Sequence, residues 1–232
     1  MRTREVEALE AQLNDLVALV RDLSSEDFAR PTRCPGWSVV ELVAHCEGIL
    51  QRLVGENAQP VDGKAEIDRV GYYRYDPDGK REGEDPEKTF SEIIRDRVIN
   101  EVEGRSGEQL RASLTETAVA AIGGIHEIPA DRVIQRPGHP RMSYGEFVAS
   151  RNLEFGVHTM DIAHAIGQPE QVQPGSGAVI TGILDALLGE PVPKSIRWSQ
   201  TTYILTGTGR SELEPADRLK LGVLAVRFPL LR

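Results

Sequence analysis

The sequence predicts a mainly α-helical protein, with a helical bundle over residues 1–167 and a small α+β appendix over residues 168–232. Three observations lead to this prediction. Apolar residues recur at intervals of three and four along most of the first part, which is the periodicity of amphipathic helices. Capping residues and glycines mark where these segments begin and end. After them, a Pro- and Gly-containing segment at 168–177 precedes a stretch of mixed character.

Composition and charge narrow the class of protein. A chain of 232 residues is long enough to bury a sizeable core. Its net charge of −9 is a poor match for nucleic-acid phosphates, and no basic run suggests a membrane surface. No stretch approaches the roughly 18 consecutive apolar residues of a membrane span, and the charged N-terminus is unlike a secretory signal. Because the chain has only two cysteines, we expect a cytoplasmic protein with reduced thiols. We also expect a monomer or homodimer, without nucleic-acid or membrane partners.

The first half of the bundle follows from periodicity and capping. Apolar positions from Val6 to Leu23 predict a helix over roughly residues 3–23, and Ser-Ser-Glu-Asp then begins a further short segment. Two prolines and a glycine at 30–37 interrupt the chain. Ser38, with a glutamate three residues later, forms a capping box that predicts a second long helix over 38–54.

The remaining elements are predicted in the same way. The polar residues 56–85 predict a long loop, of the kind that is usually functional or mobile. Further helices are predicted over 85–104, 107–124 and from the cap residue Ser143 to Gly167, with an irregular segment at 125–142. In the appendix we expect a short helix at 177–188, a strand at 195–205 and a closing helix at 214–228.

The helix that ends at Gly167 carries polar residues on the face that should be apolar. Counted at about 100° per residue, Arg151, Glu154 and Asp161 all fall within about 60° of His158. Burying two carboxylates and an imidazole without partners would cost several kcal/mol, so something must compensate them. A divalent metal would do so, because Glu154 and His158 are four residues apart and can share one ion. A plain buried ion pair with Arg151 is the alternative.

A metal needs further ligands, and His45 is the candidate on the helix over 38–54, at the edge of its apolar stripe. Two imidazoles and one carboxylate suit zinc and leave a position open for water or a substrate thiol. Asp161 would accept a hydrogen bond from an imidazole N–H. Arg151 would pair with Glu154 or with an incoming anion.

Two segments resemble the signatures of a known family. Residues 30–49, RPTRCPGWSVVELVAHCEGI, resemble the Cys-Pro-Gly-Trp turn and Leu-Val-Ala-His helix of the mycothiol-dependent maleylpyruvate isomerase family, in the DinB-like superfamily. Residues 151–167 resemble its Arg-x-x-Glu-x-x-x-His-x-x-Asp helix. The resemblance implies a DinB-like four-helix bundle that holds a divalent metal, usually zinc, on His45, Glu154 and His158. It also implies mycothiol as cosubstrate, whose thiol the metal activates for isomerisation or S-transfer on a small electrophile.

Two other functions stay open. One is a metal-dependent hydrolase in which zinc-bound water is the nucleophile. The other is a non-catalytic bundle with a structural metal, which binds a partner or a small molecule. An open coordination position favours catalysis, whereas a fourth protein ligand favours structure.

Several side chains near these motifs have a structural explanation that we prefer. Cys34 is expected to pack in its Pro-Gly turn rather than act as a nucleophile, and Cys46 to lie in the core. We expect Trp37 to pack at the helix start and His164 to face solvent. The basic segment 136–141 could meet a carboxylate of the thiol or the electrophile, but we expect a solvated loop. The tyrosines at 72–75 could instead shape a substrate entrance.

Overall fold

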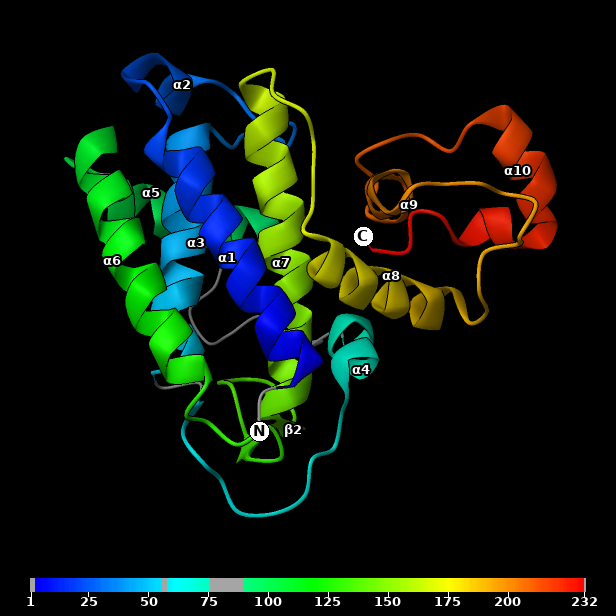
Figure 1. Ribbon diagram of the computed structural model, residues 1–232, viewed down its shortest axis with the longest axis horizontal. Helices are drawn as coiled ribbons and strands as arrows, with labels where there is room; N and C mark the ends of the chain where they lie inside the picture. Colours follow the sequence, from blue (N-terminus) through cyan, green and yellow to red (C-terminus); the bar gives the residue numbers. More distant parts are fainter. Residues whose placement is uncertain (1–2, 56–57, 76–89, 232) are drawn as a thin grey trace.

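The computed structural model describes residues 3–55, 58–75 and 90–231. Four long helices in this part of the chain form the bundle (Figure 1). α1 packs against α6 and α7, and α3 packs against the same two helices, so the four form a closed ring. They are α1 (Arg4–Arg21), α3 (Val39–Leu53), α6 (Gly107–Ile125) and α7 (Tyr144–Ala165). The mainly helical fold and its four-helix bundle are therefore confirmed.

Shorter elements surround this ring. The helices are α2 (Ser25–Ala29), α4 (Arg69–Arg74), α5 (Phe90–Val102), α8 (Pro174–Leu188), α9 (Gln200–Gly207), α10 (Pro215–Leu221) and the 3₁₀ helix η2 (Gly222–Arg227). Two short strands, β1 (Val133–Ile134) and β2 (Met142–Ser143), pair antiparallel with Val133 opposite Ser143. The predicted loop at 56–85 thus contains α4, while its residues 56–57 and 76–85 lie outside the described residues, as do the first residues of the helix predicted from residue 85.

Helix starts lie where capping predicted them. The backbone N–H of Ser38 donates to Glu41 Oε2 at 2.6 Å, which completes the capping box of α3. Ser143 Oγ accepts from the backbone N–H of Glu146 at 3.4 Å and begins α7. These two helices carry the candidate ligands. The local sequence therefore already fixes where along each helix the ligand residues lie.

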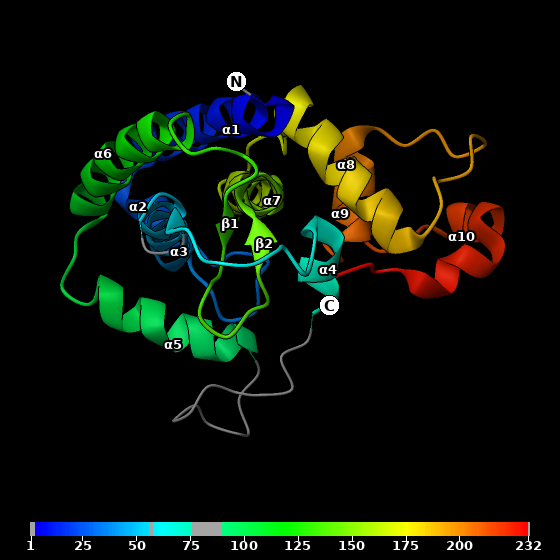
Figure 2. The ribbon, with the colours of Figure 1, turned by 90° about the horizontal axis from the view of Figure 1, so that it is seen from below.

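α7 lies at the centre of the molecule, with α1, α3, the β1–β2 hairpin and α8 around it (Figure 2). Buried side chains therefore point from it in several directions, among them Phe147, Phe155 and Met160. The apolar sector predicted for this helix is only part of what it buries. Because α8 covers a further side, α7 has no fully solvated face on which charged groups could remain hydrated.

The strand expected at 195–205 is wrong. Ser199 Oγ accepts from the backbone N–H of Thr202 at 3.0 Å and caps α9, whose Tyr203 and Ile204 are buried with residues of α8. The segment has β-favouring composition, but an N-cap and a helical packing surface outweigh that weak preference. The appendix is consequently helical rather than α+β, and both strands of the described residues belong to the bundle.

The boundary expected after residue 167 coincides with a turn at Gly167, which has a φ of 72° between α7 and α8. Apolar packing continues across it, because Leu153 and Met160 of α7 share a buried cluster with Ile183 of α8. Independent folding of residues 1–167 therefore stays a prediction. No helix among the described residues is both long and apolar enough to cross a bilayer.

Candidate metal centre

Three of the predicted side chains meet between α3 and α7. One ligand atom each from His45, Glu154 and His158 lies within 4.8 Å of the other two. The two imidazole rings meet edge to face, with their centroids 5.2 Å apart. His158 Nε2 is 3.7 Å from Glu154 Oε2, which is too long for a strong hydrogen bond but suits two donors facing one ion.

The protonation states of His45 and Glu154 also suit a metal. Burial and the neighbouring His158 lower the pKa of His45 to about 3, so this imidazole is neutral and has a free lone pair. Burial alone would raise the pKa of Glu154, but Arg151 and His158 outweigh it and hold that pKa well below its usual range. Burial would lower the pKa of His158, but its contacts with Asp161 and Glu154 outweigh burial and raise that pKa, so a metal must displace a proton from this imidazole. An ionised carboxylate and imidazole nitrogens are the donor types that zinc takes, so the residues present fit a divalent ion.

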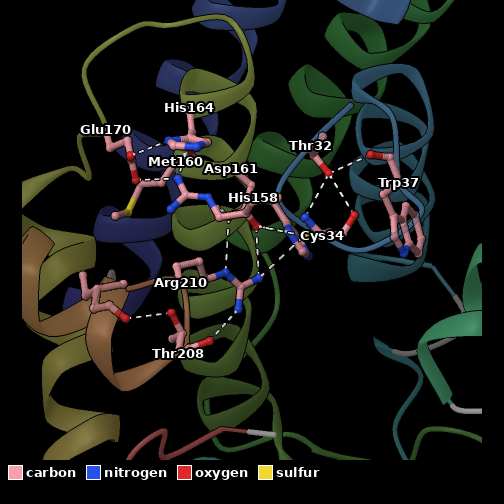
Figure 3. A network of polar contacts seen from close by, with 12 residues as sticks. Thr32, Cys34, Trp37, His158, Met160, Asp161, His164, Glu170, Thr208 and Arg210 are labelled. Carbon is pink, nitrogen blue, oxygen red and sulfur yellow. Dashed lines mark hydrogen bonds and ion pairs between the residues drawn. The ribbon is translucent and has the colours of Figure 1, made fainter. Parts of the chain in front are cut away.

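Asp161 fixes the orientation of the second imidazole (Figure 3). Its Oδ2 lies 3.3 Å from His158 Nδ1. Burial would raise the pKa of Asp161, but His158 and Arg210 outweigh burial and hold the carboxyl ionised. An ionised carboxylate can only accept, so Nδ1 of His158 carries a proton and Nε2 is the nitrogen turned toward Glu154.

Two arginines that the sequence did not indicate hold Asp161 in turn. Arg33 Nε lies 3.1 Å from Asp161 Oδ1, and Arg210 Nη2 lies 3.0 Å from Oδ2. Arg210 comes from the turn after α9, and its Nη1 donates to the carbonyl oxygen of Thr208 at 3.0 Å (Figure 3). No local pattern marks either arginine, since each acts on a residue far away in the sequence.

Cys34, His158 and Asp161 form a second group with ligand atoms this close together. It is the weaker candidate for a metal because both oxygens of Asp161 already contact arginines. The backbone carbonyl of Cys34 accepts from the N–H of Trp37 at 3.0 Å in a tight turn. The Sγ of Cys34 lies 3.4 Å from Asp161 Oδ2. Burial and Asp161 raise the pKa of the Cys34 thiol to about 11, so the sulfur is a hydrogen-bond donor rather than a nucleophile.

Cys34→Ser should accordingly keep its metal and at least about half of any thiol-dependent rate. With the pKa of Cys34 near 11, roughly one thiol in a thousand is ionised at pH 8, and a serine hydroxyl can make the same hydrogen bond. Metal analysis and initial rates check this. A folded, metal-loaded variant without turnover would instead identify Cys34 as the nucleophile.

Other sequence predictions have mixed outcomes. Cys46 is fully buried, as predicted. His164 is exposed, also as predicted, and its Nδ1 lies 2.8 Å from Glu170 Oε1. Trp37 is buried at the start of α3, and its ring also meets that of His45 with centroids 5.5 Å apart. It therefore both packs at the helix start and lines the site.

Arg151 extends the site away from Asp161. Its Nη2 lies 3.7 Å from Glu154 Oε1, which makes the predicted pairing a loose one. The guanidinium lies over the rings of Phe147 and Tyr72, at 5.0 and 5.2 Å. Arg136, expected in a solvated loop, instead hydrogen-bonds to the Tyr72 hydroxyl and is partly buried there. That expectation is wrong for Arg136, because aromatic rings from α4 and α7 cover it.

Comparisons with known proteins identify a family and a similar fold. The model of one family, the mycothiol maleylpyruvate isomerase N-terminal domain, matches residues 9–163. Two solved structures, a mycothiol-dependent maleylpyruvate isomerase and a single-site mutant of it, have a similar fold, each with a TM-score of 0.52 and 12% identity over 79% of this chain and 72% of theirs. A comparison with curated proteins found no match.

Proposed function

Because this chain belongs to the mycothiol maleylpyruvate isomerase N-terminal domain family, whose members are enzymes, we propose that it is a metal-dependent, mycothiol-using isomerase or S-transferase. The observation that carries the proposal is the convergence of His45, Glu154 and His158 within 4.8 Å. Its substrates would be a small-molecule thiol and a small electrophile. A cytoplasmic location and a monomeric or homodimeric state belong to the same proposal.

His45, Glu154 and His158 would hold the metal, which we propose to be zinc. When bound, the ion would supply a Lewis acid that takes the thiol sulfur and lowers its pKa. Asp161 would keep the proton of His158 on Nδ1 and so leave the lone pair of Nε2 for the metal. Arg33 and Arg210 hold Asp161 ionised and in place, which makes them positioning residues.

The proposed reaction begins when the thiol loses its proton to solvent. The thiolate sulfur adds to the β-carbon of an enone, and the electron pair of the double bond moves to the carbonyl oxygen. Rotation about the resulting single bond precedes the reverse step. In that step the electron pair on the enolate oxygen moves back to re-form the carbon–carbon double bond, and the carbon–sulfur bond breaks with its bonding pair leaving on sulfur. The thiol is then regenerated. In an S-transfer, a leaving group departs with its bonding electrons instead and the thioether remains.

Thiol dependence tests this function. The zinc-loaded chain should consume electrophiles from a panel only when mycothiol is present, and a chelator should abolish the rate. The gain over the uncatalysed reaction should be largest below pH 8, because a free thiol with a pKa of about 8.5 is mostly protonated there. Loss of substrate absorbance and product mass provide the measurement.

The two alternative functions give different results in the same assay. Ester or amide turnover without thiol, abolished by the chelator, would contradict the proposal and identify a hydrolase that uses zinc-bound water. A folded, metal-loaded chain that turns over no member of the panel would favour the non-catalytic binding function.

A further inference from the structure

Two arginine side chains lie together on the side of Glu154 that faces away from Asp161. Arg151 comes from α7, and Arg136 comes from the loop that connects β1 to β2, the two strands next to α7 in Figure 2. Both guanidinium carbons lie over the Phe147 ring, at 5.0 and 5.7 Å, and over the Tyr72 ring, at 5.2 and 5.4 Å. Two positive charges thus share one aromatic surface, where little water can screen their repulsion.

Among the described residues, too few negatively charged groups lie near Arg136 and Arg151 to neutralise their two positive charges. The carboxylate near it is Glu154, whose Oε1 is 3.7 Å from Arg151 Nη2, beyond hydrogen-bonding distance. Within the part of the chain that the structure describes, the buried Nη2 of Arg151 and Nε of Arg136 have no hydrogen-bond acceptor. Arg151 is only 4% exposed, so water cannot readily replace a missing acceptor.

The imbalance becomes larger if the function proposed above holds, on which this inference rests. Glu154 would then be a metal ligand, and the ion would add two more positive charges to the same region. The arginines on the other side of the site cannot serve as an anchor for a substrate anion, because Arg33 and Arg210 already contact Asp161. The thiol would be held through its sulfur, which leaves Arg136 and Arg151 for the second substrate.

We propose that Arg136 and Arg151 form the anion-binding subsite that takes a carboxylate of the electrophile. A planar guanidinium presents paired N–H groups that match the two oxygens of a carboxylate, with better geometry than an ammonium group. The half-buried Tyr72 ring supplies an apolar surface against which an unsaturated carbon chain can lie, whereas Phe147 is fully buried and lies behind the two guanidinium groups. Arg136 and Arg151 would therefore select acids over their neutral derivatives.

A matched pair of electrophiles tests the subsite: 3-benzoylacrylate and its methyl ester, each with mycothiol and the zinc-loaded full chain. In Arg136→Gln, the acid-to-ester ratio of kcat/KM should fall about tenfold or more, mainly through KM of the acid. Differences in intrinsic reactivity cancel because the same two compounds are compared in each variant. Arg141→Gln is the matched control, since Arg141 lies in the same loop but pairs with Glu66 at 2.7 Å. Its ratio should stay unchanged.

Binding provides a readout without turnover. Calorimetric titration with 3-benzoylpropionate, the saturated acid, should give a dissociation constant about tenfold higher for Arg136→Gln than for wild type or Arg141→Gln. Arg136→Lys keeps the charge but loses the paired donors, so a smaller loss is expected if the glutamine variant does not fold. An unchanged ratio and unchanged binding in folded Arg136 variants would overturn the subsite.

Failure of the proposed function would look different. A wild-type chain that binds no zinc and shows no thiol-dependent turnover would contradict that function, while titration of the metal-free chain with 3-benzoylpropionate would still test the arginine pair. Binding that Arg136→Gln weakens would then support the subsite alone. Absence of binding by the wild-type chain would overturn it.

Discussion

Replacing His158 with alanine should remove the metal from this protein and leave its fold intact. His158 is one of three proposed metal ligands. Changing a residue that only contacts a ligand typically lowers metal affinity about 10–100-fold, so the loss of a ligand itself should lower it further. The fold should remain because Glu154 keeps Arg151 nearby and Asp161 keeps Arg33 and Arg210. Metal content per chain after dialysis, together with the melting temperature, measures both effects.

His164→Ala is the matched control for this experiment. It removes an imidazole from the same helix, but His164 is exposed and pairs with Glu170 rather than with the proposed ligands. This variant should keep a full equivalent of metal. Equal metal content in His158→Ala and wild type would show that the ligand assignment is wrong. Loss of metal from both variants would indicate non-specific binding.

Asp161→Asn should reduce both stability and rate, because one carboxylate satisfies groups from three separate parts of the chain. Its removal leaves Arg33 and Arg210 partly buried without the ionised acceptor, which should cost about 3 kcal/mol of unfolding free energy. It also removes the group that fixes His158, so the thiol-dependent rate should fall about 10–100-fold. Urea unfolding and initial rates measure the two effects separately.

Glu170→Gln separates the two roles of Asp161. Glu170 pairs with Arg33 and His164 at the edge of the same network, but it makes no contact with His158 among the described residues. We expect a loss of about 1 kcal/mol in unfolding free energy and no change in rate. If Asp161→Asn behaved like Glu170→Gln, the positioning role of Asp161 would be refuted.

Local chemistry explains why the bundle and half of the site were predictable from sequence. Capping boxes and an apolar period of three and four residues act within one or two turns, so Ser38 and Ser143 mark the starts of α3 and α7 without knowledge of the rest of the chain. Glu154 and His158 are four residues apart on one helix, which places both side chains on one face in any helical structure. A third donor on α3 required only that two long helices pack together.

The sequence by itself thus determined the helical bundle, the ionisable face of α7 and the donor types of the candidate metal centre. Only the tertiary structure decided that segment 195–205 folds as the helix α9, and that Arg33 and Arg210 hold Asp161. It also decided that Arg136 lies with Arg151 over shared aromatic rings. The physical reason is the range of the interactions. Caps and helix faces depend on neighbours in sequence, whereas ion pairs and burial depend on residues that meet only after the chain has folded.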